Sequence, residues 1–350
     1  MAAKTGSNTK IGLNFASAID SVVAAGAGHQ VECESFDHNK NQERTALGAI
    51  GSGLAMEKHS FKGAARPTAS MEVNVKNDGT SLALIPWFAQ DERAPVLVTS
   101  GVYEHSVIPQ LQSINCFGNL AIQADTTDVY EYINGVLSNL SVNITPNQPL
   151  KISAAPQFGA VRVDGTTNTV STLNSATEPA SVKVLVSRPD TYVRINAQAG
   201  GALASGDVIP VTNVTVEYTL PREFVEEMKG SAGFSAPRLT DILGAMVTFT
   251  IKEQSEAGFA FIRAHTADTE YKMDIIVQGA LISGSHYNEA RFYFPRLLVE
   301  SDPQSPVTSA AINPRTVTLK AFAADANPTG MVSVLPHFVI KNPRATKLTV

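Results

Sequence analysis

The chain has 350 residues, of which 43% are hydrophobic and 17% are charged, and its net charge is −5 at pH 7. A chain of this length is expected to form about two domains, each large enough to bury a core of its own. The negative charge argues against a protein that grips nucleic acid by its phosphates, because that function needs basic patches. It is compatible with a wall past which nucleic acid slides, because a mildly acidic surface repels phosphates.

The cysteines and the apolar runs exclude two further classes. Cys33 and Cys116 are far apart and neither lies in a CxxC pattern, so no zinc site is predicted. We expect two buried free thiols, with a single disulfide as the open alternative. The longest apolar run, 82–89, is far shorter than the roughly 20 residues of a membrane-spanning helix and contains Pro86. Asp20 interrupts any signal-peptide core, which predicts a cytoplasmic product without a membrane anchor.

The first 56 residues differ in composition from the rest of the chain. Residues 1–56 are rich in Gly, Ala, Ser and Asn, and they show little alternation of apolar and polar residues. Such a stretch is typical of a disordered tail. It is equally typical of an arm and loop that become ordered only against a neighbouring subunit, with the ordering entropy lost at assembly. The second interpretation assigns residues 1–56 to assembly.

A first β unit is expected over residues 57–175. Asn134-Gly135 is a dipeptide that forms a hairpin turn or a bulge. The stretch 156–181 is a connection rich in Gly, Thr, Asn and Ser, with room for a short hairpin around 160–163. A short helix or turn is expected over 81–89. Alternation and turn residues predict strands over 58–61, 71–75, 101–108, 117–123, 129–133, 136–144 and 150–154.

A second β unit is expected over residues 176–325, followed by a C-terminal extension over 326–350 that packs as a strap. A helix is expected over 221–228, because Pro221 suits its first position and Lys229-Gly230 suits its end. Strands are predicted over 182–186, 192–195, 214–218, 245–251, 259–264, 271–277, 280–283, 290–294 and 316–322.

Short motifs of the first unit recur in the second at a nearly constant spacing. The strand-like run that begins at Met71 is echoed 143 residues later by the run that begins at Val214. Ala-Asp-Thr at 124–126 returns at 267–269, and the glycine at 135 returns at 279. Elements that recur in one order at one offset indicate a fold used twice. The alternative is that both halves are merely β-rich. In either case the predicted fold class is mainly β with short helices.

The sequence contains almost no pattern that is typical of catalysis. The sequence has no phosphate-binding loop of the GxxxxGK type, no HExxH and no EF-hand loop, and its seven histidines are scattered. We therefore predict no catalytic, cofactor-binding or metal site, and no cofactor. Carboxylates do recur, and a pair of them can serve as acid and base in glycoside hydrolysis, but a solvated surface is the more ordinary interpretation. The recurring acids are Asp125, Asp128 and Glu131, echoed by Asp268, Glu270 and Asp274.

Three stretches carry a resemblance to a known family. They are Ser70–Val75 followed by a short apolar helix, Tyr132–Ile144 followed by Gln148–Ser153, and Ile276–Gly284 followed by Ala290–Arg296. Together they resemble the tail tube proteins of long-tailed bacteriophages, over about residues 57–325. The resemblance implies a β-sandwich or barrel-like sheet with a helix, which assembles into rings of six tube folds. Three chains complete a ring if the fold is duplicated, and six complete it otherwise.

The resemblance also implies a function and partners. Stacked rings would form a hollow tube in the virion tail, built in the host cytoplasm, that conducts DNA without sequence-specific binding. The expected partners are copies of the chain, the tape measure protein, the translocating DNA and other tail proteins at the tube ends. Loops such as 34–56 or 156–181 would bridge rings. Repeated around a ring, Asp125, Asp128, Asp268 and Glu270 would make the inner wall negative.

Two alternatives come from other functional classes. A surface adhesin or carbohydrate-binding protein predicts a signal peptide and exposed aromatic residues, and the chain has only one Trp. A glycosidase predicts that the recurring carboxylates converge in a cleft.

Overall fold

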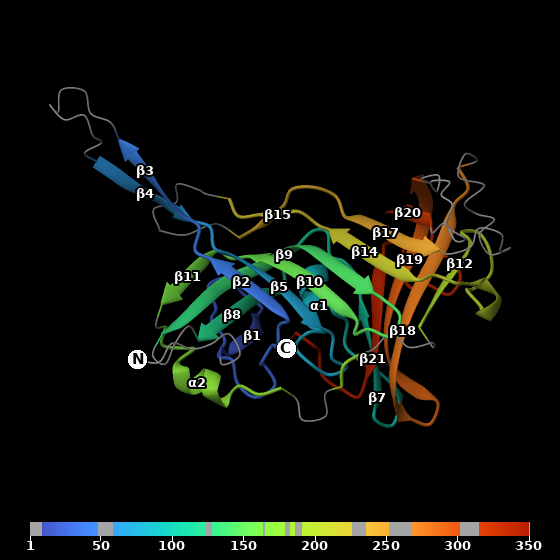
Figure 1. The fold of residues 1–350 in the computed structure, drawn as a ribbon, viewed down its shortest axis with the longest axis horizontal. Helices are drawn as coiled ribbons and strands as arrows, with labels where there is room; N and C mark the ends of the chain where they lie inside the picture. Colours follow the sequence, from blue (N-terminus) through green and yellow to red (C-terminus); the bar gives the residue numbers. More distant parts are fainter. Residues whose placement is uncertain are drawn as a thin grey trace, which may run out of the picture.

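The computed structural model describes residues 9–47, 59–123, 128–163, 165–178, 183–185, 191–225, 236–251, 268–301 and 315–349. In this part of the chain, 17 strands form one antiparallel sheet system, and two further pairs form two-stranded ribbons (Figure 1). The α-helices there are α1 (Leu84–Ala89) and α2 (Val170–Ser175), each of six residues. The predicted fold class, mainly β with short helices, is confirmed.

Seven strands form what we call the wide sheet. In their order of pairing they are β2 (Ser35–Asn39), β5 (Thr68–Asn74), β10 (Lys151–Gln157), β9 (Val129–Ile144), β14 (Asn213–Thr219), β17 (Gly244–Ile251) and β20 (Arg315–Phe322). Strands β5, β10, β14, β17 and β20 and the second half of β9 alternate inward-facing apolar residues with mainly polar residues that face away from the core, which is the pattern of a sheet covered on one side.

Seven strands form a second part of the system, which we call the back sheet. Its long strand β19 also pairs with β20 through residues 296–301, and so joins the back sheet to the wide sheet. One hydrophobic core contains buried side chains from both sheets and from α1. In their order of pairing the strands are β6 (Val96–Thr99), β7 (Val102–Val107), β21 (His337–Asn342), β19 (His286–Ser301), β18 (Tyr271–Ser283), β12 (Tyr192–Ala197) and β13 (Val208–Ile209).

The N-terminal part of the chain contributes a strand and buried side chains to the core of the protein. Strand β1 (Ile11–Ala16) pairs with β8 (Phe117–Gln123), and Leu13 is fully buried. β8 pairs with the first half of β9, whose other edge pairs with β11 (Ala160–Val163). The stretch 160–163 therefore pairs with β9 rather than forming a separate hairpin. Residues 1–56 include this internal strand, and a role of this stretch in assembly stays a prediction.

The dipeptide Asn134-Gly135 forms a bulge inside one long strand, where two strands were expected. Gly118 of β8 pairs with Gly135, but Leu120 pairs with Tyr132, so β9 contains one extra residue, and Asn134 has φ 60°. A side chain does not fit on Gly118, because a Cβ there would lie 2.2 Å from the Trp87 ring. The indole Nε1 of Trp87 donates to Gly135 O at 3.0 Å. The bend thus lets β9 belong to two parts of the sheet system.

The predicted helix over 221–228 is wrong in the part that the structure describes. Arg222-Glu223 is a short strand, β15, which pairs with β16 (Arg238–Leu239), and residues 226–235 lie outside the described residues. The Arg222 guanidinium is buried and donates to the carbonyls of Leu137 and Phe88. These tertiary hydrogen bonds hold Arg222 extended and outweigh the local helix signals. The predicted strand 259–264 also lies outside the described residues.

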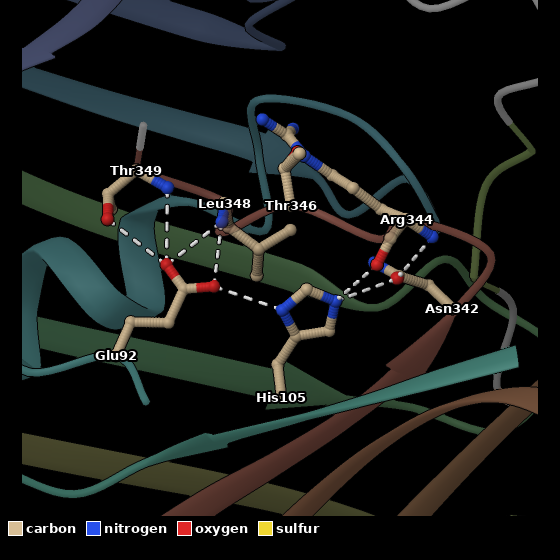
Figure 2. A network of polar contacts seen from close by, with 7 residues as sticks. All are labelled: Glu92, His105, Asn342, Arg344, Thr346, Leu348 and Thr349. Carbon is tan, nitrogen blue, oxygen red and sulfur yellow. Dashed lines mark hydrogen bonds and ion pairs between the residues drawn. The ribbon is translucent and has the colours of Figure 1, made fainter. Parts of the chain in front are cut away.

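The C-terminal extension contains a core strand, β21, and after it a segment up to residue 349 that we call the return segment. Hydrogen bonds hold the return segment against the rest of the protein. β21 lies between β7 and β19 in the back sheet. Beyond it, Leu348 N donates to the buried Glu92 carboxylate at 2.7 and 2.9 Å, and Thr349 donates to it from N and Oγ1 (Figure 2). His105 Nδ1 lies 3.0 Å from Glu92 Oε1, and its Nε2 lies 3.0 Å from Asn342 Oδ1. The segment is thus anchored between α1 and β7.

Candidate assembly and channel surface

The solvent-facing side of the wide sheet carries rows of mainly polar side chains that cross from strand to strand. Within one such row, Thr215 Oγ1 donates to Asn143 Oδ1 at 3.1 Å, and the hydroxyls of Thr248 and Thr318 lie 3.2 Å apart. This row consists of Asn74, Lys151, Asn143, Thr215, Thr248 and Thr318, one residue from each of six strands. The wide sheet therefore offers hydrogen-bonding groups over its whole width without concentrated charge.

A shallow groove of about 470 Å³ runs along the middle of this side. Its lining includes hydroxyls of Ser141 and Ser153 and the carboxylates of Glu72 and Glu217, and it contains no histidine, cysteine or lysine. Lys151, next to the groove, donates to Glu72 at 3.1 Å and forms an ion pair with Glu34 at 2.6 Å. Those hydrogen bonds to Glu34 and Glu72 raise the pKa of Lys151. The positive charge closest to the groove is therefore balanced locally.

The predicted lumen acids occupy other places. Asp125 lies outside the described residues, and Asp128 lies half-buried just before β9. Asp268 is exposed with φ 48°, and Glu270 is half-buried and forms an ion pair with Arg296. None of the three described acids lines the groove. That they face a channel axis stays a prediction.

The remaining member of each acidic set has an internal structural partner. Glu131 is buried, and its Oε1 accepts a hydrogen bond from Asn168 N at 2.6 Å. Asp274 is fully buried and accepts from Arg194 Nε at 2.9 Å. The hydrogen bond to Asp274 raises the pKa of Arg194. Both carboxylates therefore have partners inside the protein. Glu131 holds the connection that contains Asn168, and Asp274 holds Arg194 of β12.

The acids that do line the groove were not predicted from the sequence as site residues. Glu72 and Glu217 occupy outward positions of β5 and β14 and belong to one row with Ser141 and Ser153. The sequence does indicate that these two side chains face solvent, because residues 68–74 and 213–219 alternate polar with apolar residues along their whole length. Alternation alone predicts an exposed face, but it does not tell which strands lie side by side.

One border of the wide sheet is unpaired among the described strands. β2 pairs with β5 alone, so its other edge is not paired with any described strand. The chain continues from β2 and β5 into a ribbon of β3 (Gln42–Leu47) and β4 (His59–Ala65), which pair only with each other. This ribbon projects away from the rest of the described chain (Figure 1).

Other classes of site find no support in the part of the chain that the structure describes. No three His, Cys, Asp or Glu side chains gather there as metal ligands would. Among those residues no helix is long and apolar enough to span a membrane. Cys33 and Cys116 are free thiols, as expected, but only Cys116 is buried and Cys33 is half-buried. Burial raises the pKa of each to about 12. Neither a known protein family nor a curated protein matches this sequence.

Proposed function

We propose that this chain is the structural subunit of a bacteriophage tail tube, in which copies assemble into rings and stacked rings form a channel for DNA. The observation that carries the proposal is the solvent-facing side of the wide sheet. Strands from both halves of the chain contribute to it, and its rows consist mainly of hydroxyl and amide side chains. We further propose that the chain contains the tube fold twice and that its sheets form a β-sandwich.

The chemistry of that side suits a channel wall. A protein binds DNA nonspecifically through Lys and Arg side chains that neutralise phosphates. A wall along which DNA slides should therefore expose few Lys or Arg side chains that lack an acidic partner. Lys151 is paired with Glu34 and Glu72, and the groove itself contains acids and no cations. Hydroxyl and amide groups remain hydrated and let DNA move past. The same wall would face the tape measure protein before DNA enters.

The unpaired features of the chain suit self-assembly. The free edge of β2 would gain partners in a ring, because unpaired edges are satisfied by strands or loops of a neighbour. The β3–β4 ribbon reaches beyond the body and would contact another copy. Head-to-tail contacts close into rings, and ring-on-ring contacts extend into filaments. The proposed role is structural, so we expect no enzymatic turnover.

Electron microscopy of the purified protein tests the proposal. Negative-stain images should show hollow rings or tubes, and an averaged top view should reveal three or six chains per ring. A protein that stays a compact monomer at high concentration would contradict the proposal.

A lysine variant tests which side of the sheet faces the channel. Ser141→Lys should leave tubes intact but make them retain short DNA duplexes at low salt, because the new cations would line the channel. Ser106→Lys, on β7 of the back sheet, is the matched control and should retain much less DNA. Equal retention by both variants would show that the wide sheet does not line the channel.

A further inference from the structure

The free edge of the back sheet at β6 is apolar on both of its faces. Val96, Leu97 and Val98 are consecutive, and they are 63%, 58% and 41% exposed. Among the described strands β6 pairs with β7 alone, and none of its four residues is charged. A strand that exposes apolar side chains in both directions and an unpaired backbone edge is normally covered by a partner in soluble proteins.

The opposite edge of the same sheet also exposes an apolar side chain next to an unpaired strand edge. In the part of the chain that the structure describes, β13 pairs with β12 alone, and its Val208 is 42% exposed. Beside β13 lies a groove of about 300 Å³, whose lining contains no charged residue and includes Ile144, Val193, Ile209 and Val211. The groove opens between the end of the wide sheet and the border of the back sheet.

We propose that β6 of one copy docks into the groove beside β13 of a second copy. The proposal rests on the proposed self-assembly and names the contact that carries it. Both surfaces are uncharged and mainly apolar, so the contact removes apolar area from water without desolvating a charge. The two surfaces lie at opposite borders of one sheet, so each contact leaves one edge strand and one groove free. Such a contact is head-to-tail and propagates until a ring closes.

Engineered cysteines test the contact directly. The double variant Leu97→Cys with Val208→Cys should form a ladder of disulfide-linked oligomers under oxidising conditions, because each link joins β6 of one copy to β13 of the next. Each single variant should give no cross-linked ladder. The native thiols contribute little background, because their pKa is about 12 and Cys116 is buried. Cross-linked dimers of Leu97→Cys alone would reveal a two-fold contact between β6 strands and overturn the proposal.

Charge substitutions test the energetics of the same contact. Leu97→Asp and Val208→Asp should each weaken self-association about tenfold or more, measured by sedimentation velocity over a concentration series. Leu281→Asp is the matched control, because Leu281 is 54% exposed in the β18–β19 hairpin, away from both surfaces. Circular dichroism checks that all three variants remain folded. An equal mixture of the two interface variants should form dimers and nothing larger.

The outcomes separate this contact from the proposed function. If Leu97→Asp still forms rings like the unmodified protein, the contact is wrong and the tail tube proposal survives. If the double cysteine variant forms the ladder but no hollow ring is ever seen, the contact stands and the tube proposal fails. A protein that remains monomeric at every concentration overturns both.

Discussion

His337 shows how one buried side chain makes the stability of this protein depend on pH. Its ring is fully buried and stacks on Tyr293 with ring centroids 4.9 Å apart. Nδ1 donates to Leu335 O at 2.8 Å, whereas Nε2 has no hydrogen-bond partner among the residues that the structure describes. A second proton on Nε2 would therefore place a positive charge in the core without an acceptor. Burial, with a further contribution from Arg93, lowers the pKa of His337 from 6.5 to about 4.

We predict acid destabilisation between pH 6.5 and pH 4. The unfolded chain binds a proton on His337 in this range and the folded chain does not, so stability is complete above pH 6.5 and falls as the pH falls. The loss should reach about 3 kcal/mol, because each pKa unit corresponds to 1.36 kcal/mol. Urea unfolding measured at several pH values checks this. His337→Gln should flatten the dependence over the same range, and an unchanged slope would count against the assignment.

At the scale of elements, the Glu92 carboxylate holds the return segment that follows β21. It receives hydrogen bonds from Leu348 and Thr349, which lie more than 250 residues away in sequence. His105 is fully buried beside it, and both of its ring nitrogens face oxygen acceptors, including Arg344 O at 3.1 Å. One carboxylate thus connects the end of α1, strand β7 and the C-terminal segment.

We predict that Glu92→Gln loosens this segment. The new amide group would present N–H donors to the backbone N–H groups of Leu348 and Thr349, which would lose acceptors. The expected loss of stability is about 1–3 kcal/mol, the usual result of leaving buried donors unsatisfied. Hydrogen exchange should accelerate at Leu348 and Thr349. Glu104→Gln on the surface of β7 is the control and should change stability by less than about 0.5 kcal/mol. Unaltered exchange in Glu92→Gln would refute the anchoring role.

At the scale of the whole molecule, the two predicted units share one sheet. β9 of the first unit pairs with β14 of the second along six residue pairs, from Val214↔Ile144 to Thr219↔Asn139. The same hydrophobic core contains Val142 from one unit and Val216 from the other, both fully buried. Separating the units would expose this core and leave a row of backbone groups without partners.

We predict that the two halves unfold together. Trp87 is the only tryptophan and reports on the first half by its fluorescence, whereas far-UV circular dichroism reports on strands of both halves. The two unfolding curves in urea should coincide. Val142→Ala should shift both by the same amount, about 2 kcal/mol, because a cavity in a shared core is felt by the whole unit. Two separated transitions would instead support independent domains.

The sequence anticipated those features that depend on neighbouring residues. Alternation along 213–219 and 244–251 was sufficient to predict β14 and β17, because burial on one side of a strand leaves a period of two. It did not anticipate that 11–16 forms an internal strand, because its partner β8 lies about a hundred residues further on. The helix signals at 221–228 were overridden by hydrogen bonds of Arg222 to residues 88 and 137.

By itself, the amino-acid sequence determined that this is a mainly β chain, where several of its strands run, and that the backbone is irregular at residues 134–135. These properties follow from the conformational preferences of a residue and its immediate neighbours. Only the tertiary structure decided that β9 and β14 are partners, that Glu72 and Glu217 line one groove, and that Glu131 and Asp274 are buried. Pairing between distant strands depends on the free energy of the whole core, and no local pattern contains it.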